Sequence, residues 1–226
     1  MTLDGVKPHW WRIAVLVPAV VIAAFSWKHV IAGTFALLPV VVWCSLARTP
    51  RTGLAVGAVL LALMAWFVLP RELGLAGSWV PAKIEVYWLH TTLAAVVCAI
   101  AARRGGARLA SLVCAGFLFA GASLFAAYEA PPGDEGVTPA PAQLAITEQR
   151  FDCGSHQCWQ VVETAGTGAP EVLREHLLAR NFTPAPALDT RVSRFCRTTG
   201  LVVDHKVCAD VTSFAPDTAR LEWYVN

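Results

Sequence analysis

The sequence predicts a five-helix membrane bundle followed by a small extracytoplasmic α+β domain stapled by disulfides. Three observations predict this fold class: long apolar runs within residues 1–128, a proline-rich segment at 129–143, and a mixed α+β pattern with four cysteines at 144–226. Of the 226 residues, 56% are hydrophobic and 15% are charged, and the mean hydropathy is +0.52. Because a soluble domain carries about 25% charged residues, this composition indicates a membrane protein.

Each apolar run is long enough for a membrane-spanning helix, which needs about 20 predominantly apolar residues. Charged residues occur only near the ends of the runs, at Arg12, Glu85 and Arg108. We predict five spans, at about 10–27, 30–47, 52–70, 84–102 and 107–128. The turn at Lys28 and His29 is so short that a re-entrant hairpin is the alternative for the first two runs. A signal peptide has only one short apolar core, so it does not explain this succession.

Lysine and arginine are distributed unevenly around the predicted spans, which indicates an orientation. The segments on the side of the N-terminus hold Lys7, Arg12, Arg48, Arg51, Arg103, Arg104 and Arg108. The loops on the other side hold Lys28, Arg71 and Lys83. Because loops rich in Lys and Arg stay in the cytoplasm, the N-terminus is predicted inside and residues 144–226 outside a cell membrane.

The two parts of the chain also differ in net charge. Residues 1–128 hold ten Lys and Arg against three Asp and Glu, whereas residues 129–226 hold eight against thirteen. An acidic C-terminal part argues against nucleic-acid binding, which needs a basic surface. The predicted partners are therefore the lipid bilayer and an extracytoplasmic protein or envelope ligand.

Residues 129–143 contain four prolines and two glycines, which predicts an extended spacer between the bundle and the folded tail. The tail is predicted to begin with a hairpin of Leu144–Phe151 and Trp159–Glu163. A helix is predicted to start near Pro170, since proline is favoured in a first helical turn. The later strand candidates are 201–203, 207–211 and 220–225.

The tail holds four of the seven cysteines, Cys153, Cys158, Cys196 and Cys208. An even set of cysteines on the oxidising side of a membrane predicts two disulfides. Of the three possible connectivities, we favour 153–158 with 196–208, because each pair is close in sequence around a plausible turn. A domain of about 80 residues is near the size at which a core alone is marginal, so the disulfides matter for folding. The remaining cysteines lie singly in predicted spans and are expected to be buried small apolar residues: Cys44, Cys98 and Cys114.

Zinc binding, thiol redox chemistry and hydrolysis by the tail are supported by weaker sequence patterns than the disulfides are. The four cysteines, with His156 and His205, are zinc-type ligands, but the C-x4-C and C-x11-C spacings are looser than a C-x2-C knuckle. A redox role would resemble that of membrane thiol oxidases, which use a reactive C-x-x-C pair that this sequence lacks. Asp152, Ser155 and His156 form a solvated turn in our interpretation, because hydrolase triads are assembled in space and not within one loop.

His90 is the intramembrane polar candidate. It lies six residues beyond Ile84, or about 9 Å into the span at 1.5 Å per residue. Ionisable groups at such depth in a membrane commonly belong to functional sites, which suggests a proton- or ligand-linked role for His90. The structural alternative is a neutral histidine that hydrogen-bonds Thr91, Thr92 or a neighbouring helix.

No phosphate-binding loop, dinucleotide fingerprint or H-E-x-x-H motif occurs, so we predict neither a cofactor nor an enzyme. The first functional hypothesis is a multi-pass membrane protein that presents an external binding domain. The alternatives are a small transporter or permease component, with His90 on the path, and an envelope thiol-redox protein that uses the tail cysteines.

Overall fold

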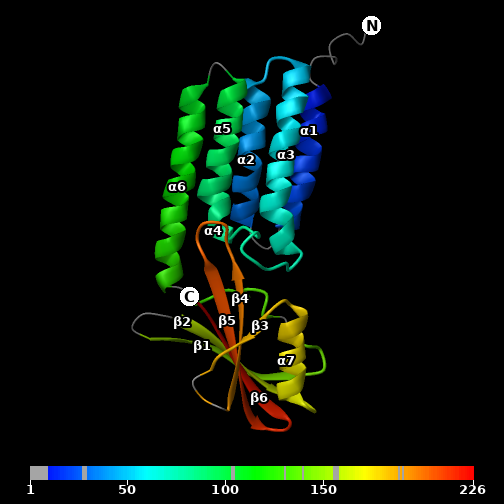
Figure 1. Cartoon of the computed structure of the whole chain (residues 1–226), viewed down its shortest axis with the longest axis vertical. Coiled ribbons are helices and arrows are strands. Elements are labelled where there is room, and N and C mark those ends of the chain that lie inside the picture. Colours follow the sequence, from blue (N-terminus) through cyan, green and yellow to red (C-terminus); the bar gives the residue numbers. More distant parts are fainter. Residues whose placement is uncertain are drawn as a thin grey trace. The chain divides into compact units, whose positions relative to one another are not determined.

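The computed structural model describes residues 10–26, 30–102, 105–129, 131–138, 140–154, 158–187, 189 and 191–226. The chain forms two compact units (Figure 1). The helical unit comprises Met1–Leu73 and Val80–Ser123, and the C-terminal unit comprises Gly74–Trp79 and Leu124–Asn226. The Lys28–His29 turn lies outside the described residues.

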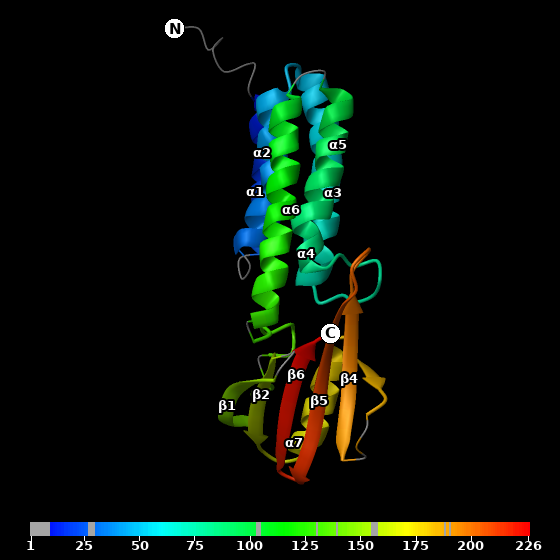
Figure 2. The same ribbon diagram turned by 90° about the vertical axis from the view of Figure 1, so that its left-hand side faces the viewer.

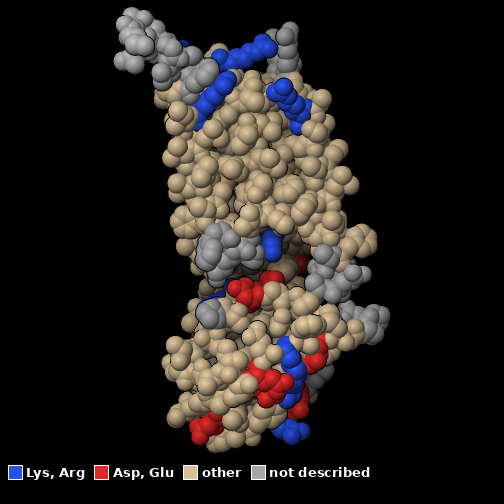
Figure 3. All heavy atoms as spheres, turned by 180° about the vertical axis from the view of Figure 1, so that it is seen from behind, with Lys and Arg blue, Asp and Glu red and all other residues tan. Residues whose placement is uncertain are grey.

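The helical unit follows the apolar runs of the sequence. Its elements are α1 (Trp10–Phe25), α2 (Val30–Leu46), α3 (Pro50–Glu72), α4 (Lys83–Glu85), the π-helix η3 (Val86–His90), α5 (Thr91–Ala101) and α6 (Gly106–Glu129). Among the described residues, three segments are long and apolar enough to cross a membrane, namely Pro50–Glu72, Lys83–Ala101 and Gly106–Phe125. Helices α1 and α2 are apolar but have only 16 and 17 residues, so five crossings remain a prediction. On the face in Figure 3, Lys and Arg side chains gather at one end of this unit and its middle is uncharged.

Two glycines bring α3 into close contact with α1. A Cβ at Gly53 would lie 2.6 Å from the ring of Trp11, and one at Gly57 would lie 2.7 Å from Val15. The indole Nε1 of Trp43 on α2 donates a hydrogen bond of 3.1 Å to the Gly53 carbonyl. These contacts join the first three helices, because small residues let helix backbones approach closely.

Of the cysteines in the helical unit, Cys44 and Cys98 are buried as expected. Cys114 is exposed on α6, so the prediction of burial was wrong there. A helix that packs along only one side leaves its other side on the surface of the bundle, and that surface suits an apolar thiol if it faces lipid.

The C-terminal unit is a six-stranded antiparallel sheet with one helix (Figure 2). The strands are β1 (Ala145–Cys153), β2 (Cys158–Ala165), β3 (Thr183–Ala185), β4 (Val192–Thr199), β5 (His205–Ala215) and β6 (Thr218–Val225), with α7 (Ala169–Ala179) between β2 and β3. Their order in the sheet is β1-β2-β6-β5-β4-β3, so the last strand pairs with β2 inside the sheet. Pro170 lies in the first turn of α7, where the sequence placed it.

One face of the sheet packs against α7 around an apolar core. Leu173 and Leu177 of α7 are fully buried against side chains such as Phe195, Leu221 and Trp223. Fully burying a leucine side chain contributes about 1.5–3 kcal/mol, so these contacts hold the helix on the sheet.

The proline-rich segment belongs to this core, so the extended spacer was a wrong prediction for its described part. Val137 is fully buried within the core. Trp223 Nε1 donates to the Gly133 carbonyl at 2.8 Å, and Arg180 donates to the carbonyls of Gly136 and Thr138 at 2.8 Å each. The segment folds as turns without a helix or strand: the Val137 amide donates to the Asp134 carbonyl at 2.6 Å, and side chains distant in sequence satisfy the carbonyls of Gly133, Gly136 and Thr138.

Strand β4 was missed and residues 201–203 were wrongly predicted as a strand. These residues form the tip of the β4–β5 hairpin instead. Gly200 has a φ of 122°, and a Cβ there would lie 2.0 Å from the Val203 carbonyl oxygen, so the chain turns at this point. Strand β4 was not recognised because arginines interrupt its apolar residues. In the structure Phe195 faces the core and its neighbours along the strand face away.

Candidate binding surface on the sheet

The sheet face away from α7 carries rows of charged and aromatic side chains. Alternation along the strands places there the side chains next to each core residue, and we name this surface the ion-pair face. Its charged, aromatic and cysteine members on the four central strands are Trp159, Glu163, Arg194, Cys196, Lys206, Cys208, Asp210, Arg220, Glu222 and Tyr224. Sequence analysis singled out only the cysteines among them. The signal for the rest was the alternation of charged with apolar residues along β4 and β6.

Two arginines on the ion-pair face are held by carboxylates directly across the strands. Arg194 donates two hydrogen bonds of 2.8 Å to the carboxylate of Asp210, its register partner on β5. Arg220 donates bonds of 3.0 and 2.7 Å to Glu163, its partner on β2. Hydrogen bonding to Asp210 raises the pKa of Arg194 above its usual value. The Arg194–Asp210 pair is bidentate, with one bond to each carboxylate oxygen, and this geometry fixes the orientation of both side chains. Arg220 bonds a single oxygen of Glu163.

Aromatic rings support the same guanidinium groups. The Arg194 guanidinium lies 5.8 Å from the ring centroid of Tyr224, and that of Arg220 lies 4.8 Å from Phe214. Burial, and next the charge of Asp210, raises the pKa of the Tyr224 hydroxyl. Phe214 itself is 58% exposed. The face therefore offers aromatic rings and arginine side chains together, the residue types that are enriched at protein-binding surfaces.

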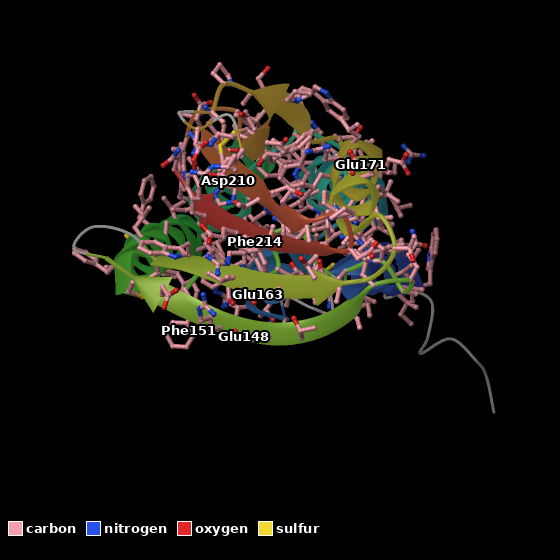
Figure 4. All side chains as sticks on the ribbon, turned by 90° about the horizontal axis from the view of Figure 1, so that it is seen from below. Glu148, Phe151, Glu163, Glu171, Asp210 and Phe214 are labelled. Atoms are coloured by element: carbon pink, nitrogen blue, oxygen red, sulfur yellow. A yellow bond between two sulfur atoms is a disulfide. The ribbon has the colours of Figure 1, made fainter. Side chains whose placement is uncertain are left out.

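The outer strand β1 extends this pattern. Arg150 forms a short hydrogen bond with Glu148 and a contact of 3.4 Å with Asp152, and these residues face the same side as Glu163. With this strand included, five carboxylates (148, 152, 163, 210 and 222) stand against three guanidinium groups (150, 194 and 220) and the ammonium group of Lys206. Figure 4 views the sheet from one end, with Glu148, Glu163 and Asp210 on separate strands and Glu171 on α7. The described part of the face thus has an excess of one negative charge.

The four tail cysteines form two disulfides, Cys153–Cys158 and Cys196–Cys208, which is the pairing that the sequence favoured. Cys153 and Cys158 are cross-strand partners at the end of the β1–β2 hairpin, with Cα atoms 4.0 Å apart. Cys196 and Cys208 are cross-strand partners on the ion-pair face, two residues from Arg194 and Asp210 along their strands, and their Cα atoms are 4.1 Å apart. Each bridge therefore reinforces an existing strand pair.

These bonds remove the thiolates on which the zinc interpretation depended. Within the described residues no group of three or more metal-ligating side chains occurs. His205 instead lies 3.1 Å from a carboxylate oxygen of Glu135. His156 and Ser155 lie outside the described residues. Whether either disulfide exchanges with a partner thiol stays a prediction.

His90 ends the π-helix of the helical unit and is almost fully buried. Its ring lies 5.3 Å from that of Phe67, and its Nδ1 has no hydrogen-bond partner among the described residues. The sequence suggested Thr91 and Thr92 as hydrogen-bond partners of a neutral, structural His90. Their hydroxyls instead donate to the backbone carbonyls of Tyr87 and Trp88. The threonine hydroxyls therefore bond the backbone of their own helix and not the histidine.

Helix α6 packs directly on this π-helix. A Cβ at Gly116 would lie 2.2 Å from the Tyr87 carbonyl oxygen and 2.5 Å from the Thr91 hydroxyl. The rings of Phe35, Tyr87 and Phe119 pack together beside it. The nearby Glu85, predicted at the rim of a span, is fully buried and accepts a 2.8 Å hydrogen bond from the Ala82 amide.

No protein family, curated protein or solved structure matches this chain significantly. Its class is therefore defined by its own architecture: apolar helices, three of them able to span a membrane, joined to a disulfide-bonded antiparallel sheet domain. Its function is inferred below from the surfaces and sites just described.

Proposed function

We propose that this chain is a multi-pass cell-membrane protein that presents its C-terminal unit outside the cell as a binding domain. The ion-pair face binds an extracytoplasmic polypeptide that carries net positive charge. The observation that carries the proposal is the bidentate Arg194–Asp210 pair beside the Cys196–Cys208 bridge, on the sheet face that α7 leaves uncovered.

Rigid side chains favour this function for a physical reason. Association costs about 0.5–1.5 kcal/mol for each flexible side chain that becomes ordered. Side chains already held by carboxylates, rings and a disulfide avoid much of that cost. The excess of carboxylates favours a basic partner, and complementary charge also speeds encounter.

Five membrane crossings with a cytoplasmic N-terminus complete the proposal. The Lys and Arg distribution of the sequence supports this orientation. The two disulfides support an oxidising compartment for the C-terminal unit, since such bonds persist outside the cytoplasm.

Photo-crosslinking in intact cells tests the binding function. A photoreactive phenylalanine analogue replaces Glu222 on the ion-pair face in the full-length protein. A matched replacement of Glu175, exposed on α7, serves as the control. We expect one dominant crosslinked polypeptide from position 222 and none from 175. Its yield should fall several-fold between about 50 and 300 mM salt, because exposed charges are screened.

The outcome of this experiment can contradict the proposal in two ways. Equal crosslinking from both positions would mean non-specific contact. No crosslink from position 222, with the protein folded and at the surface, would remove the binding function.

We propose a proton-linked transporter component as the second candidate, because the buried His90 Nδ1 lacks a partner within the described residues. Ionisable groups at membrane depth mark proton and substrate paths. Purified protein in vesicles with a pH-sensitive dye inside should then conduct protons. The variant His90→Leu should lose this flux while Cys114→Ala, on the exposed side of α6, keeps it. Equal flux in both variants, or none in the wild type, would contradict this candidate.

A further inference from the structure

The loop between α3 and α4 belongs to the C-terminal unit and is hydrogen-bonded into it. The Gly77 amide donates to the Thr198 carbonyl at 2.9 Å, and Gly77 forms a parallel bridge with Thr199 at the end of β4. Asn181, which follows α7, donates from its side chain to the Gly74 carbonyl at 2.9 Å. The loop therefore lies beside the tip of the β4–β5 hairpin (Figure 2).

These two segments form an exposed apolar surface. Leu75 and Trp79 of the loop are 38% and 51% exposed, and Val202 and Val203 of the hairpin tip are 66% and 41% exposed. We call these four residues the apolar rim. Neither 73–82 nor 198–203 contains a charged residue, although charged residues are common elsewhere in this unit.

The loop that carries part of the apolar rim connects two helices of the helical unit. The loop starts directly after α3, which ends at Glu72, and it leads into α4, which begins at Lys83. Both helices belong to segments that are long and apolar enough to cross a membrane. A short loop between two spans must stay at the membrane surface, and the hairpin tip is hydrogen-bonded to that loop.

We propose that the apolar rim inserts into the interfacial layer of the lipid bilayer and holds the C-terminal unit against the membrane. Tryptophan prefers this layer, and short uncharged apolar segments gain free energy there. A soluble protein partner is a poorer match because the loop of the rim joins two segments that are long and apolar enough to span the bilayer. This inference rests on the membrane crossings of the proposed function, but not on the ion-pair face or its partner.

Two glycines with positive φ fix the backbone on which the apolar rim is displayed. Gly200 has a φ of 122° and Gly77 a φ of 123°, both in the region that favours glycine. A Cβ at Gly77 would also lie 3.1 Å from the indole of Trp79. The backbone thus holds the apolar side chains outward at fixed places, which lowers the entropic cost of insertion.

Fluorescence of single labelled cysteines tests the inference. The full-length protein, with Cys114 replaced by alanine, is reconstituted into vesicles of zwitterionic and anionic phospholipid. An environment-sensitive dye is attached at Val202→Cys and, separately, at Val203→Cys. The control is Ser213→Cys, which is exposed near the opposite end of β5. Quenching is measured with lipids whose acyl chains carry a nitroxide near the headgroup.

We expect a blue-shifted emission and at least threefold stronger lipid quenching at positions 202 and 203 than at 213. Water-like emission and weak quenching at all three positions would overturn the proposal. Blue-shifted emission without lipid quenching would also overturn it, because the rim would then contact protein. The vesicles contain no polypeptide partner. Weak lipid quenching would therefore reject insertion of the apolar rim without bearing on the binding function of the ion-pair face.

Discussion

Arg194 and Asp210 lie directly opposite one another on β4 and β5 and share two hydrogen bonds of 2.8 Å. Their side chains are 26% and 14% exposed, so the pair is more shielded from water than most surface ion pairs. The Cys196–Cys208 bridge joins the same two strands two residues away. Charge pairing and covalent bonding therefore act on one strand pair.

The variant Asp210→Asn should lower the free energy of unfolding of the C-terminal unit by about 1–2 kcal/mol. It leaves a partly shielded guanidinium without its charged partner, and partial exposure keeps the loss below that of a fully buried pair. Pulse proteolysis of the full-length protein in urea measures the change. The control is Asp189→Asn, whose ion pair with the Arg191 guanidinium is 3.8 Å long and exposed. Asparagine keeps the Oδ1 that accepts from the Arg191 amide at 2.9 Å, so this variant should change stability by less than about 0.5 kcal/mol. Similar effects of the two variants would contradict this prediction.

The variant Val137→Ala tests whether the proline-rich segment is part of the folded unit. It removes two methylene equivalents from a fully buried site and should cost about 2 kcal/mol, including the cavity. Val202→Ala makes the same change at a side chain that is 66% exposed and should cost much less in detergent. The same proteolysis assay applies. A change below about 0.5 kcal/mol at position 137 would show that the segment does not support the core.

His176 predicts a pH dependence of stability. Its Nε2 lies 2.9 Å from the Val137 carbonyl, and burial, with a smaller effect of Arg180, lowers its pKa in the folded protein. The unfolded chain, with an ordinary histidine pKa of about 6.5, therefore takes up a proton more readily than the folded protein. The stabilisation that comes from neutral His176 is therefore complete above a pH of about 6.5. It is lost as the pH falls through the pKa that His176 has in the folded protein.

Urea midpoints at pH 7.5 and 5.5 test this dependence in the full-length protein. The wild type should lose more stability between these two pH values than His176→Gln, which cannot titrate. An identical loss in both proteins would assign the pH dependence to other groups.

Gly116→Ala should destabilise the helical unit by about 1–3 kcal/mol, because its Cβ would meet the Tyr87 backbone at 2.2 Å. At Gly121 on the same helix, an added methyl group would meet nothing within 4 Å, so Gly121→Ala should be close to neutral. Thermal unfolding in detergent, followed by a thiol-reactive dye that reports the buried Cys44 and Cys98, measures both. Equal melting temperatures for the two variants would contradict the close packing of α6 on η3.

Removing the disulfides should have unequal effects. Loop entropy predicts about 3 kcal/mol for Cys196–Cys208, which closes the longer loop, and about 2 kcal/mol for Cys153–Cys158. Paired serine variants in the proteolysis assay measure each loss. A larger loss for the shorter loop would show that local packing, and not chain entropy, dominates.

Several features could be predicted because their signals are local. The apolar runs are continuous in sequence, so the five helical segments were recognised, although α1 and α2 are shorter than expected. The division of the fourth segment into α4, η3 and α5 was not predicted. The start of α7 follows from Pro170, and each cysteine pair is close in sequence. His90 was singled out from its depth alone, but its lack of a partner at Nδ1 among the described residues depends on how η3 winds.

The binding surface could be predicted only in part. The alternation along β6 was visible, yet nothing in sequence says that Glu163 meets Arg220 or that Arg194 meets Asp210. Such pairs depend on strand order, and the order places β6 between β2 and β5. Val137 likewise lies in a segment with no apolar period, and its burial depends on side chains far along the chain.

The sequence by itself determined the apolar helices and the division into a charge-poor and a charge-rich part, and it favoured the two disulfide pairings, because each of these features is encoded by neighbouring residues. Only the tertiary structure decided which charges pair on the sheet, where Val137 packs and that the loop at Gly77 joins the β4–β5 hairpin. Those features come from contacts between segments far apart in the chain, and the free energy of such contacts depends on the whole fold.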